Sequence, residues 1–273
     1  MIGYWSSRIY PQARPFRYNQ TPDVHIAEAR TTMLHSTLST KFQLENIVAN
    51  ALTDAEKIEQ LTQWTHQLWQ PQPGRFSKSD NPLTIISRAE NGERFARHDY
   101  SIVLAHAMMA VGIPTRLTTL RTRDCAWRPV SSSYLGIEYF DRDHFKWVWL
   151  DGRYGLRILQ NRLPLNALEI KEAILDQKIL ELHPDFVDLD IDNHLQALTP
   201  FLDIIVACPI GQPKHYALIP PQLKLIHNKW GFGHRLYDIS CHSIISFYAS
   251  HPMKQLTQPS TKKPVDIRTG RPL

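Results

Sequence analysis

The sequence predicts an α+β fold in which one buried helix packs on an antiparallel sheet. The chain of 273 residues is long enough to bury a large core. Residues 97–111 are apolar on nearly every side, which is typical of a helix in the middle of a core. Three segments rich in β-branched and aromatic residues follow this helix, at 115–122, 134–141 and 145–152.

The segments before the buried helix are less regular. Thr53 and Glu56 form a capping-box pair at the start of an amphipathic helix, and Gly112 with Pro114 ends the buried one. In chain order we expect an extended arm, a stretch that fits helix or strand, a helix, a loop and a short helix: residues 1–24, 25–50, 53–70, 71–82 and 83–90.

The C-terminal part has a different character. We expect helices over 163–182 and 192–207, a strand-like segment over 224–250 and a polar tail. The predicted organisation is an arm with peripheral elements, a core, an α/β extension packed on the core, and the tail: residues 1–50, 51–163, 164–253 and 254–273.

Composition limits the possible partners. The net charge of +5 is a mild basic bias that fits an anionic ligand or an acidic partner and does not by itself indicate nucleic acid. The longest apolar run, residues 201–210, is too short to span a bilayer, and the N-terminus has no apolar signal region. Three widely spaced cysteines fit neither a disulfide framework nor a zinc site. We therefore expect a cytoplasmic protein with no cofactor, metal, nucleic-acid partner or membrane partner.

Several short motifs carry a family resemblance. The chain has GIPTR at 112–116, KWVWLDG at 146–152, Glu138 in YLGIEYF, Trp64 in LTQWTHQLW, and a later LPLNALEI. Over roughly residues 50 to 175 it resembles the bacterial transglutaminase-like domain, a relative of the papain-like cysteine enzymes. The resemblance implies a catalytic Cys in the first turn of the core helix, a His on a strand and an Asp on the next strand.

Two of the three implied catalytic positions are replaced. By the family's spacing, Arg97 stands at the nucleophile position and Tyr134 at the His position, and only Asp151 remains. A guanidinium has no lone pair to offer, and a phenol with a pKa of about 10 is a poor base at neutral pH. The resemblance therefore implies a pseudoenzyme that binds a peptide, a protein or a small anion in the former active-site cleft.

The candidate binding residues surround the start of the core helix, and none is expected to be catalytic: Arg97, His98, Arg94, Tyr134, Glu138 and Asp151. Two interpretations of Arg97 remain open. It is either a neutral replacement that faces solvent or pairs with Asp99 or Asp151, or it forms an anion site with the amides of the helix N-terminus.

An active enzyme is the main alternative. It would transfer acyl groups or hydrolyse amides through Cys125, or through Asp151 with Tyr134. Taking His144 as the catalytic His fails, because Val148 would then replace the glutamate. Adjacent His98 and Asp99 are similar to metal-dependent phosphohydrolases of the HD type, with His66 and Asp151 as further ligands. His106 is expected to be a buried histidine with satisfied hydrogen bonds. A purely structural or assembly subunit is the third class of function for the whole protein.

Overall fold

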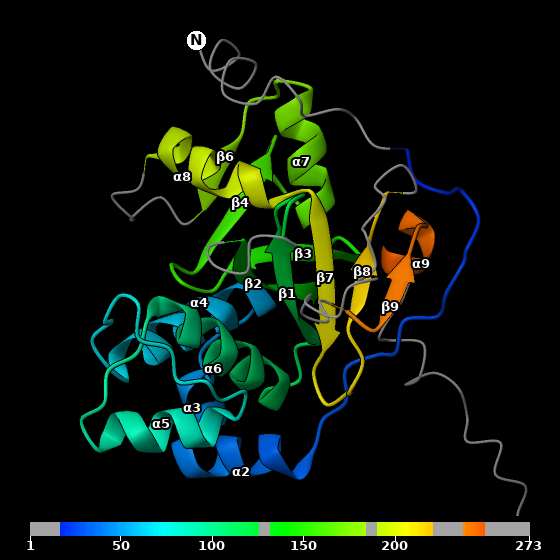
Figure 1. The fold of residues 1–273 in the computed structure, drawn as a ribbon. Coiled ribbons are helices and arrows are strands. Elements are labelled where there is room, and N and C mark those ends of the chain that lie inside the picture. Colours follow the sequence, from blue (N-terminus) through cyan, green and yellow to red (C-terminus); the bar gives the residue numbers. More distant parts are fainter. Residues whose placement is uncertain (1–16, 126–131, 184–189, 221–236, 249–273) are drawn as a thin grey trace, which may run out of the picture.

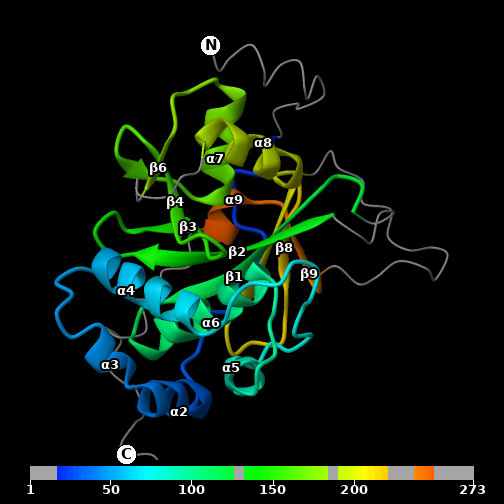
Figure 2. The same cartoon turned by 90° about the vertical axis from the view of Figure 1, so that its left-hand side faces the viewer.

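The protein forms an open, mixed α+β structure with helices on both faces of one sheet (Figures 1 and 2). The structure is a computed structural model and describes residues 17–125, 132–183, 190–220 and 237–248. In this part of the chain the strand order is β5-β4-β3-β2-β1-β7-β8-β9, with β6 beside β4. The named strand pairs are antiparallel except β8 with β9.

The described helices are α2 Met33–Phe42, α3 Leu44–Ile47, α4 Asp54–Gln67, α5 Pro82–Glu90, α6 Arg97–Ala110, α7 Ala167–Leu175, α8 Ile191–Leu198 and α9 Ile244–Tyr248, with a 3₁₀ turn at Thr199–Phe201. The described strands are β1 Thr115–Arg121, β2 Ser133–Asp141, β3 Lys146–Asp151, β4 Leu156–Gln160, β5 Leu163–Pro164, β6 Glu181–His183, β7 Ile204–Pro209, β8 Tyr216–Leu218 and β9 Ile239–Cys241.

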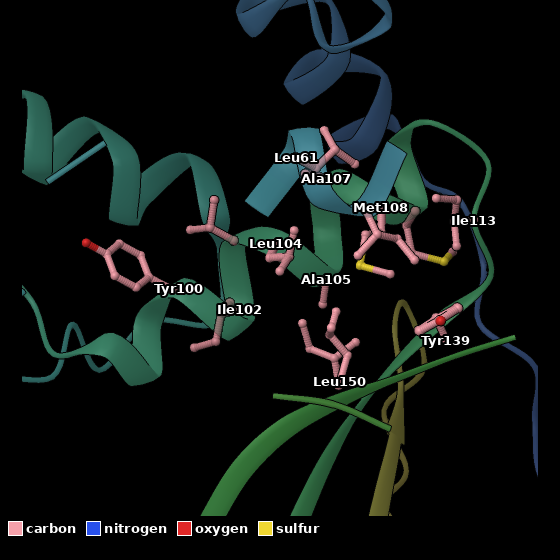
Figure 3. Packing of buried hydrophobic residues seen from close by; sticks show 14 of the residues in the cluster. Leu61, Tyr100, Ile102, Leu104, Ala105, Ala107, Met108, Ile113, Tyr139 and Leu150 are labelled. Atoms are coloured by element: carbon pink, nitrogen blue, oxygen red, sulfur yellow. The ribbon is translucent and has the colours of Figure 1, made fainter. Parts of the chain in front are cut away.

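Helix α6 is the central element of the larger core. Most of its residues are buried, and it packs between β1 and β2 on one side and α2, α4 and α5 on the other. Figure 3 shows Leu150 of β3 beneath the helix and Leu61 of α4 beside it. The chain leaves the helix through Gly112, whose φ of 81° favours glycine. The buried helix expected from the sequence is therefore confirmed.

The two faces of β2 meet different layers. Leu135, Ile137 and Tyr139 pack in the core that contains α6. The alternate residues, which include Tyr134 and Glu138, point to the face covered by α7, α8 and α9 (Figure 2). Because side chains alternate along a strand, Tyr134 and Glu138 of the expected site lie on the face of β2 away from α6.

The helix expected over 192–207 is wrong in its second half. Helix α8 ends at Leu198, a 3₁₀ turn that contains Pro200 follows, and residues 204–209 form β7 beside β1. Pro200 interrupts the helix, and the β-branched run that follows is buried between two strands, where such side chains pack well. Likewise α7 fills only part of the helix expected over 163–182, because β5 and β6 take its two ends.

Other expectations were partly met. The undecided stretch 25–50 contains two helices, α2 and α3, and residues 17–24 of the expected arm contain no helix and a single isolated bridge between Asn19 and Ser243. Within the strand-like segment 224–250, the described residues form β9 and then helix α9. Residues 1–16 of the arm and the tail 254–273 lie outside the described residues.

The sheet joins strands from both sides of the predicted boundary at residue 164, since β7 pairs with β1. None of the helices in the described ranges combines the length and the apolar character that crossing a bilayer requires.

Candidate functional site

Tyr134 and Asp151 are in direct contact. The Tyr134 hydroxyl donates a hydrogen bond of 2.5 Å to Asp151 Oδ2, and the Arg153 amide donates to Oδ1 at 2.9 Å. Asp151 is almost completely buried. Burial and the neighbouring carboxylate raise the pKa of Tyr134, so the phenol stays protonated and acts as a donor. The Tyr134 hydroxyl is therefore bonded to the carboxylate that, by the family resemblance, would orient an imidazole.

A histidine from another element stands beside this pair. His194 of α8 places Nε2 3.6 Å from Asp151 Oδ2, and the residue is 6% exposed. Within the described ranges Nε2 has no hydrogen-bond partner. Burial lowers the pKa of His194, the Arg153 charge lowers it further, and Asp151 opposes both. The site thus contains an imidazole, but not at the position that the family spacing implies.

The sequence interpretation missed His194. The pattern over 192–207 predicts one helix and contains no motif, and in a chain with thirteen histidines no single histidine is informative. One signal was present. His194 lies three residues after Ile191 and four before Leu198, so it shares the apolar face of the short helix. A histidine on that face must be buried, and its polar atoms need a partner there.

Arg97 reaches this group through a tyrosine. It is the first residue of α6, its side chain is exposed, and its guanidinium carbon lies 4.9 Å from the centre of the Tyr154 ring. The Tyr154 ring in turn meets the His194 ring edge-on, with centroids 6.2 Å apart. Arg97 does not pair with Asp99 or Asp151, and its exposed side chain fits the solvent-facing form of the first interpretation.

A second guanidinium lies in the same region. Arg153 stacks on the Tyr134 ring at 3.8 Å, and its charge also acts on His98, the second residue of α6. In the part of the chain that the structure describes, no carboxylate lies within salt-bridge distance of Arg97 or Arg153. Two positive side chains therefore gather near the start of α6 without a neutralising ion pair.

The start of α6 has no side-chain cap. Ala96 is the N-cap residue and has no side-chain oxygen to offer the first amides of the helix, although its carbonyl accepts from the Asp99 amide at 3.0 Å. Asp99 in the first turn accepts hydrogen bonds from the Ser77 amide and hydroxyl. His98 is half-buried against Phe76, and burial lowers its pKa. The positive end of the helix dipole therefore faces outward beside Arg97.

Gly152 sets the distance between the two halves of the site. A Cβ on Gly152 would lie 2.6 Å from Ser101 Oγ, so only glycine lets the turn after β3 approach α6 this closely. His66 of α4 packs on the Tyr100 ring. Burial and Arg97 lower the pKa of His66, and the Gly152 backbone and Asp151 oppose this. These contacts hold Arg97 and Asp151 at a fixed separation.

Two predicted binding residues do not join the group. Arg94 is exposed, and no contact connects it with the other candidates among the described residues. Glu138 is fully buried. It accepts hydrogen bonds from Arg116, Thr118, the Ala167 amide and Tyr248, so both of its oxygens are occupied in the interior. Glu138 consequently holds the C-terminal segment on the sheet.

The residues proposed for an HD-type metal site do not converge. Asp99 is bonded to Ser77 and His98 faces Phe76, while Asp151 is bonded to Tyr134. The described ranges contain no group of three or more histidines, cysteines and carboxylates arranged to hold a metal ion. The adjacent His98 and Asp99 are explained by the local structure at the start of α6.

The three thiols lie on other parts of the sheet. Cys125 follows β1 and is buried with Ile204 and Val206. Burial raises the pKa of Cys208 to about 11 and that of Cys241 to about 12. A nucleophilic cysteine needs a lowered pKa, so neither of these two environments favours a thiolate.

Comparisons of the chain with protein-family models, with curated proteins and with solved structures return no match. The resemblance to transglutaminase-like domains consequently rests on the motifs alone and remains a prediction. The contacts around Asp151 are observed in the structure and do not depend on this resemblance.

Proposed function

We propose that this protein is a non-catalytic member of the transglutaminase-like type that binds an anionic ligand where the active site would be. One observation carries the proposal: the Tyr134 hydroxyl occupies Asp151 Oδ2, while an exposed arginine stands at the start of α6. The carboxylate can then no longer orient a catalytic imidazole at that position, and the expected nucleophile position presents a cation.

The charges around the site favour an anion. Arg97 and Arg153 offer guanidinium donors that no carboxylate of the described residues satisfies. The adjacent tyrosine rings support both side chains through cation–π contacts. The uncapped N-terminus of α6 adds the positive end of a helix dipole.

The chemistry of these donors suits a carboxylate or a phosphate group. Such a group can belong to a small molecule or to an acidic side chain of a peptide or protein. Binding of a small ion by itself supports a small-molecule site. Binding that requires an acidic peptide indicates a longer contact surface.

The proposal is tested by titrating the protein with sulfate, acetate and an acidic peptide at low ionic strength, using calorimetry. We expect at least one to bind, and Arg97→Ala to weaken that binding about tenfold, as for the loss of one charge-assisted hydrogen bond. Arg30→Ala, which removes an exposed cation just before α2, is the matched control and should leave binding unchanged. No binding of any of the three, or equal binding by Arg97→Ala, would refute the proposal.

A second candidate, hydrolysis of an amide or ester, is favoured by the His194–Asp151 contact. With Nε2 turned toward Asp151, His194 Nδ1 would accept a proton from a water molecule as its oxygen attacks the acyl carbon, and would return the proton to the leaving group. Turnover of amide and ester substrates that His194→Gln and Asp151→Asn both abolish would support this function. Absence of turnover in a protein that binds anions would leave ligand binding as the function.

A further inference from the structure

We infer that filling the anion site brings a proton onto His194, so that the protein binds its anion and a proton together. The inference rests on the proposed anion-binding function. It concerns a residue outside the positions that the family resemblance provides, and it follows from the arrangement of His194, Asp151 and Arg153.

The first step concerns His194 Nε2, a ring nitrogen without a hydrogen-bond partner among the described residues. This nitrogen is buried. It lies 3.6 Å from Asp151 Oδ2, just beyond hydrogen-bond distance, and that oxygen accepts a hydrogen bond from Tyr134. A protonated imidazole at this position would gain an ion pair with Asp151, whereas the neutral ring gains little.

The second step concerns the charges that face His194. The turn after β3 contributes Asp151, Arg153 and the Tyr154 ring, and β2 contributes the phenol of Tyr134. Burial lowers the pKa of His194 most strongly, Asp151 raises it, and the Arg153 cation lowers it. On its own helix, Asp190 and Asp192 lie in the exposed first turn. Among the described residues, Arg153 is the cation that acts on His194, and a bound ligand can cancel its effect.

The third step is the ligand's own charge. An anion bound to Arg153 neutralises the guanidinium and adds a negative charge close to the imidazole. Both changes favour protonation of His194, and the buried position makes them stronger than they would be in water. By reciprocity, protonation of His194 must then strengthen anion binding by the same factor.

Sulfate is the appropriate probe, because it does not itself titrate near neutral pH and any proton taken up must reach the protein. Calorimetric titrations of the full chain in buffers of different ionisation enthalpy measure that uptake. We expect a fraction of one proton per sulfate at pH 7, and a sulfate affinity that rises about three- to tenfold from pH 7.5 to 6.5. His194→Gln should bind sulfate without uptake and with a flat pH dependence.

His144→Gln is the matched control, since His144 is exposed in the turn between β2 and β3 and pairs with Asp141 at 2.9 Å. It should keep the wild-type proton uptake. Should His194→Gln fold poorly, the imidazole proton signals of the wild-type protein give a second readout, and one buried histidine should titrate at higher pH with sulfate.

The outcomes separate the two proposals. Sulfate binding without proton uptake, or uptake that His194→Gln leaves unchanged, overturns the inference and leaves anion binding intact. Absence of binding for sulfate, acetate and the acidic peptide overturns the proposed function and the inference with it.

Discussion

His35 Nε2 and His106 Nδ1 lie 3.1 Å apart and join α2 to the central helix α6 in the interior. The Thr32 amide donates to His35 Nδ1 at 2.9 Å, so the His35 proton resides on Nε2 and is donated to His106. His106 in turn donates to the Asp80 carbonyl. All four ring nitrogens are bonded when both rings are neutral, so an additional proton disrupts at least one of these hydrogen bonds.

This histidine pair predicts a loss of stability in weak acid. Burial, and after it His35, lower the pKa of His106 to about 4 from an ordinary value of 6.5. Between these values the unfolded chain binds more protons than the folded one, so stability is complete above about pH 6.5 and falls as the pH drops toward 4. For His106 the loss is about 3 kcal/mol, measurable as the free energy of unfolding in denaturant at pH 7 and 4.5.

A substitution isolates this contribution from that of the other histidines. His106→Gln removes the titrating group, so the difference in unfolding free energy between pH 7 and 4.5 should shrink by most of that amount. The exposed His144→Gln is the control and should keep the wild-type difference. An unchanged pH dependence in His106→Gln would show that acid acts elsewhere.

The buried ion pair of Arg116 and Glu138 predicts that a single substitution in the pair lowers the free energy of unfolding by a large amount. Arg116 donates to Glu138 Oε2 from Nε at 3.0 Å and from Nη2 at 2.7 Å, and both residues are fully buried. The guanidinium also stacks between Trp147 and Phe247. Glu138→Gln leaves this cation without a counter-ion and should reduce the unfolding free energy by about 3–5 kcal/mol.

The control for that prediction is a surface pair of similar geometry. Arg88 donates to both oxygens of Glu93, but the pair is partly exposed. Glu93→Gln should therefore cost much less than Glu138→Gln, because water compensates for the lost ion pair. Equal losses for the two substitutions would mean that burial of Arg116 does not determine its dependence on Glu138.

The sequence was sufficient to predict the elements between residues 53 and 152. The capping box at Thr53 and the glycine after α6 are local signals, and neither depends on the rest of the chain. The strands β1, β2 and β3 were also recognisable, because they follow one another and are joined by short turns. Local patterns of this kind are the most reliable ones in a single sequence.

The arrangement beyond residue 163 depends on distant contacts. The run at Ile204–Pro209 continues a helical pattern in sequence, but pairing with β1 and β8 makes it a strand. The approach of His194 to Asp151 depends on how α8 packs across the sheet, which no spacing rule reveals. By contrast, Tyr134 and Asp151 were both expected at the site, and their contact follows from the adjacent strands β2 and β3.

The cysteine environments predict slow reaction with thiol reagents. Cys125 and Cys241 are buried, and burial raises the pKa of Cys208 to about 11. At pH 7.5 the folded protein should therefore react with a maleimide or disulfide probe more slowly than a free thiol does. Unfolding in denaturant should release three fast-reacting thiols per chain. Rapid stoichiometric labelling of Cys125 in the folded protein would instead support the enzyme alternative.

Removal of the Tyr134 hydroxyl should change the hydrogen-bond partner of the Asp151 carboxylate. Tyr134→Phe leaves Asp151 Oδ2 without its 2.5 Å hydrogen bond, at a cost of about 1–3 kcal/mol at pH 8. His194 Nε2 can replace the phenol as the donor, and the protonated ring does so more strongly than the neutral ring because it adds an ion pair with Asp151. The pKa of His194 should then rise above its unfolded value, giving a stabilisation that is present at low pH and lost as the pH rises.

Tyr134→Phe should accordingly lose less stability at pH 6 than at pH 8, relative to the wild-type protein at the same pH. Unfolding free energies of both proteins at the two pH values provide the comparison. The double variant Tyr134→Phe/His194→Gln lacks the imidazole and should lose the recovery at pH 6. A recovery that persists in the double variant would show that a group other than His194 pairs with Asp151, because this comparison changes only that ring.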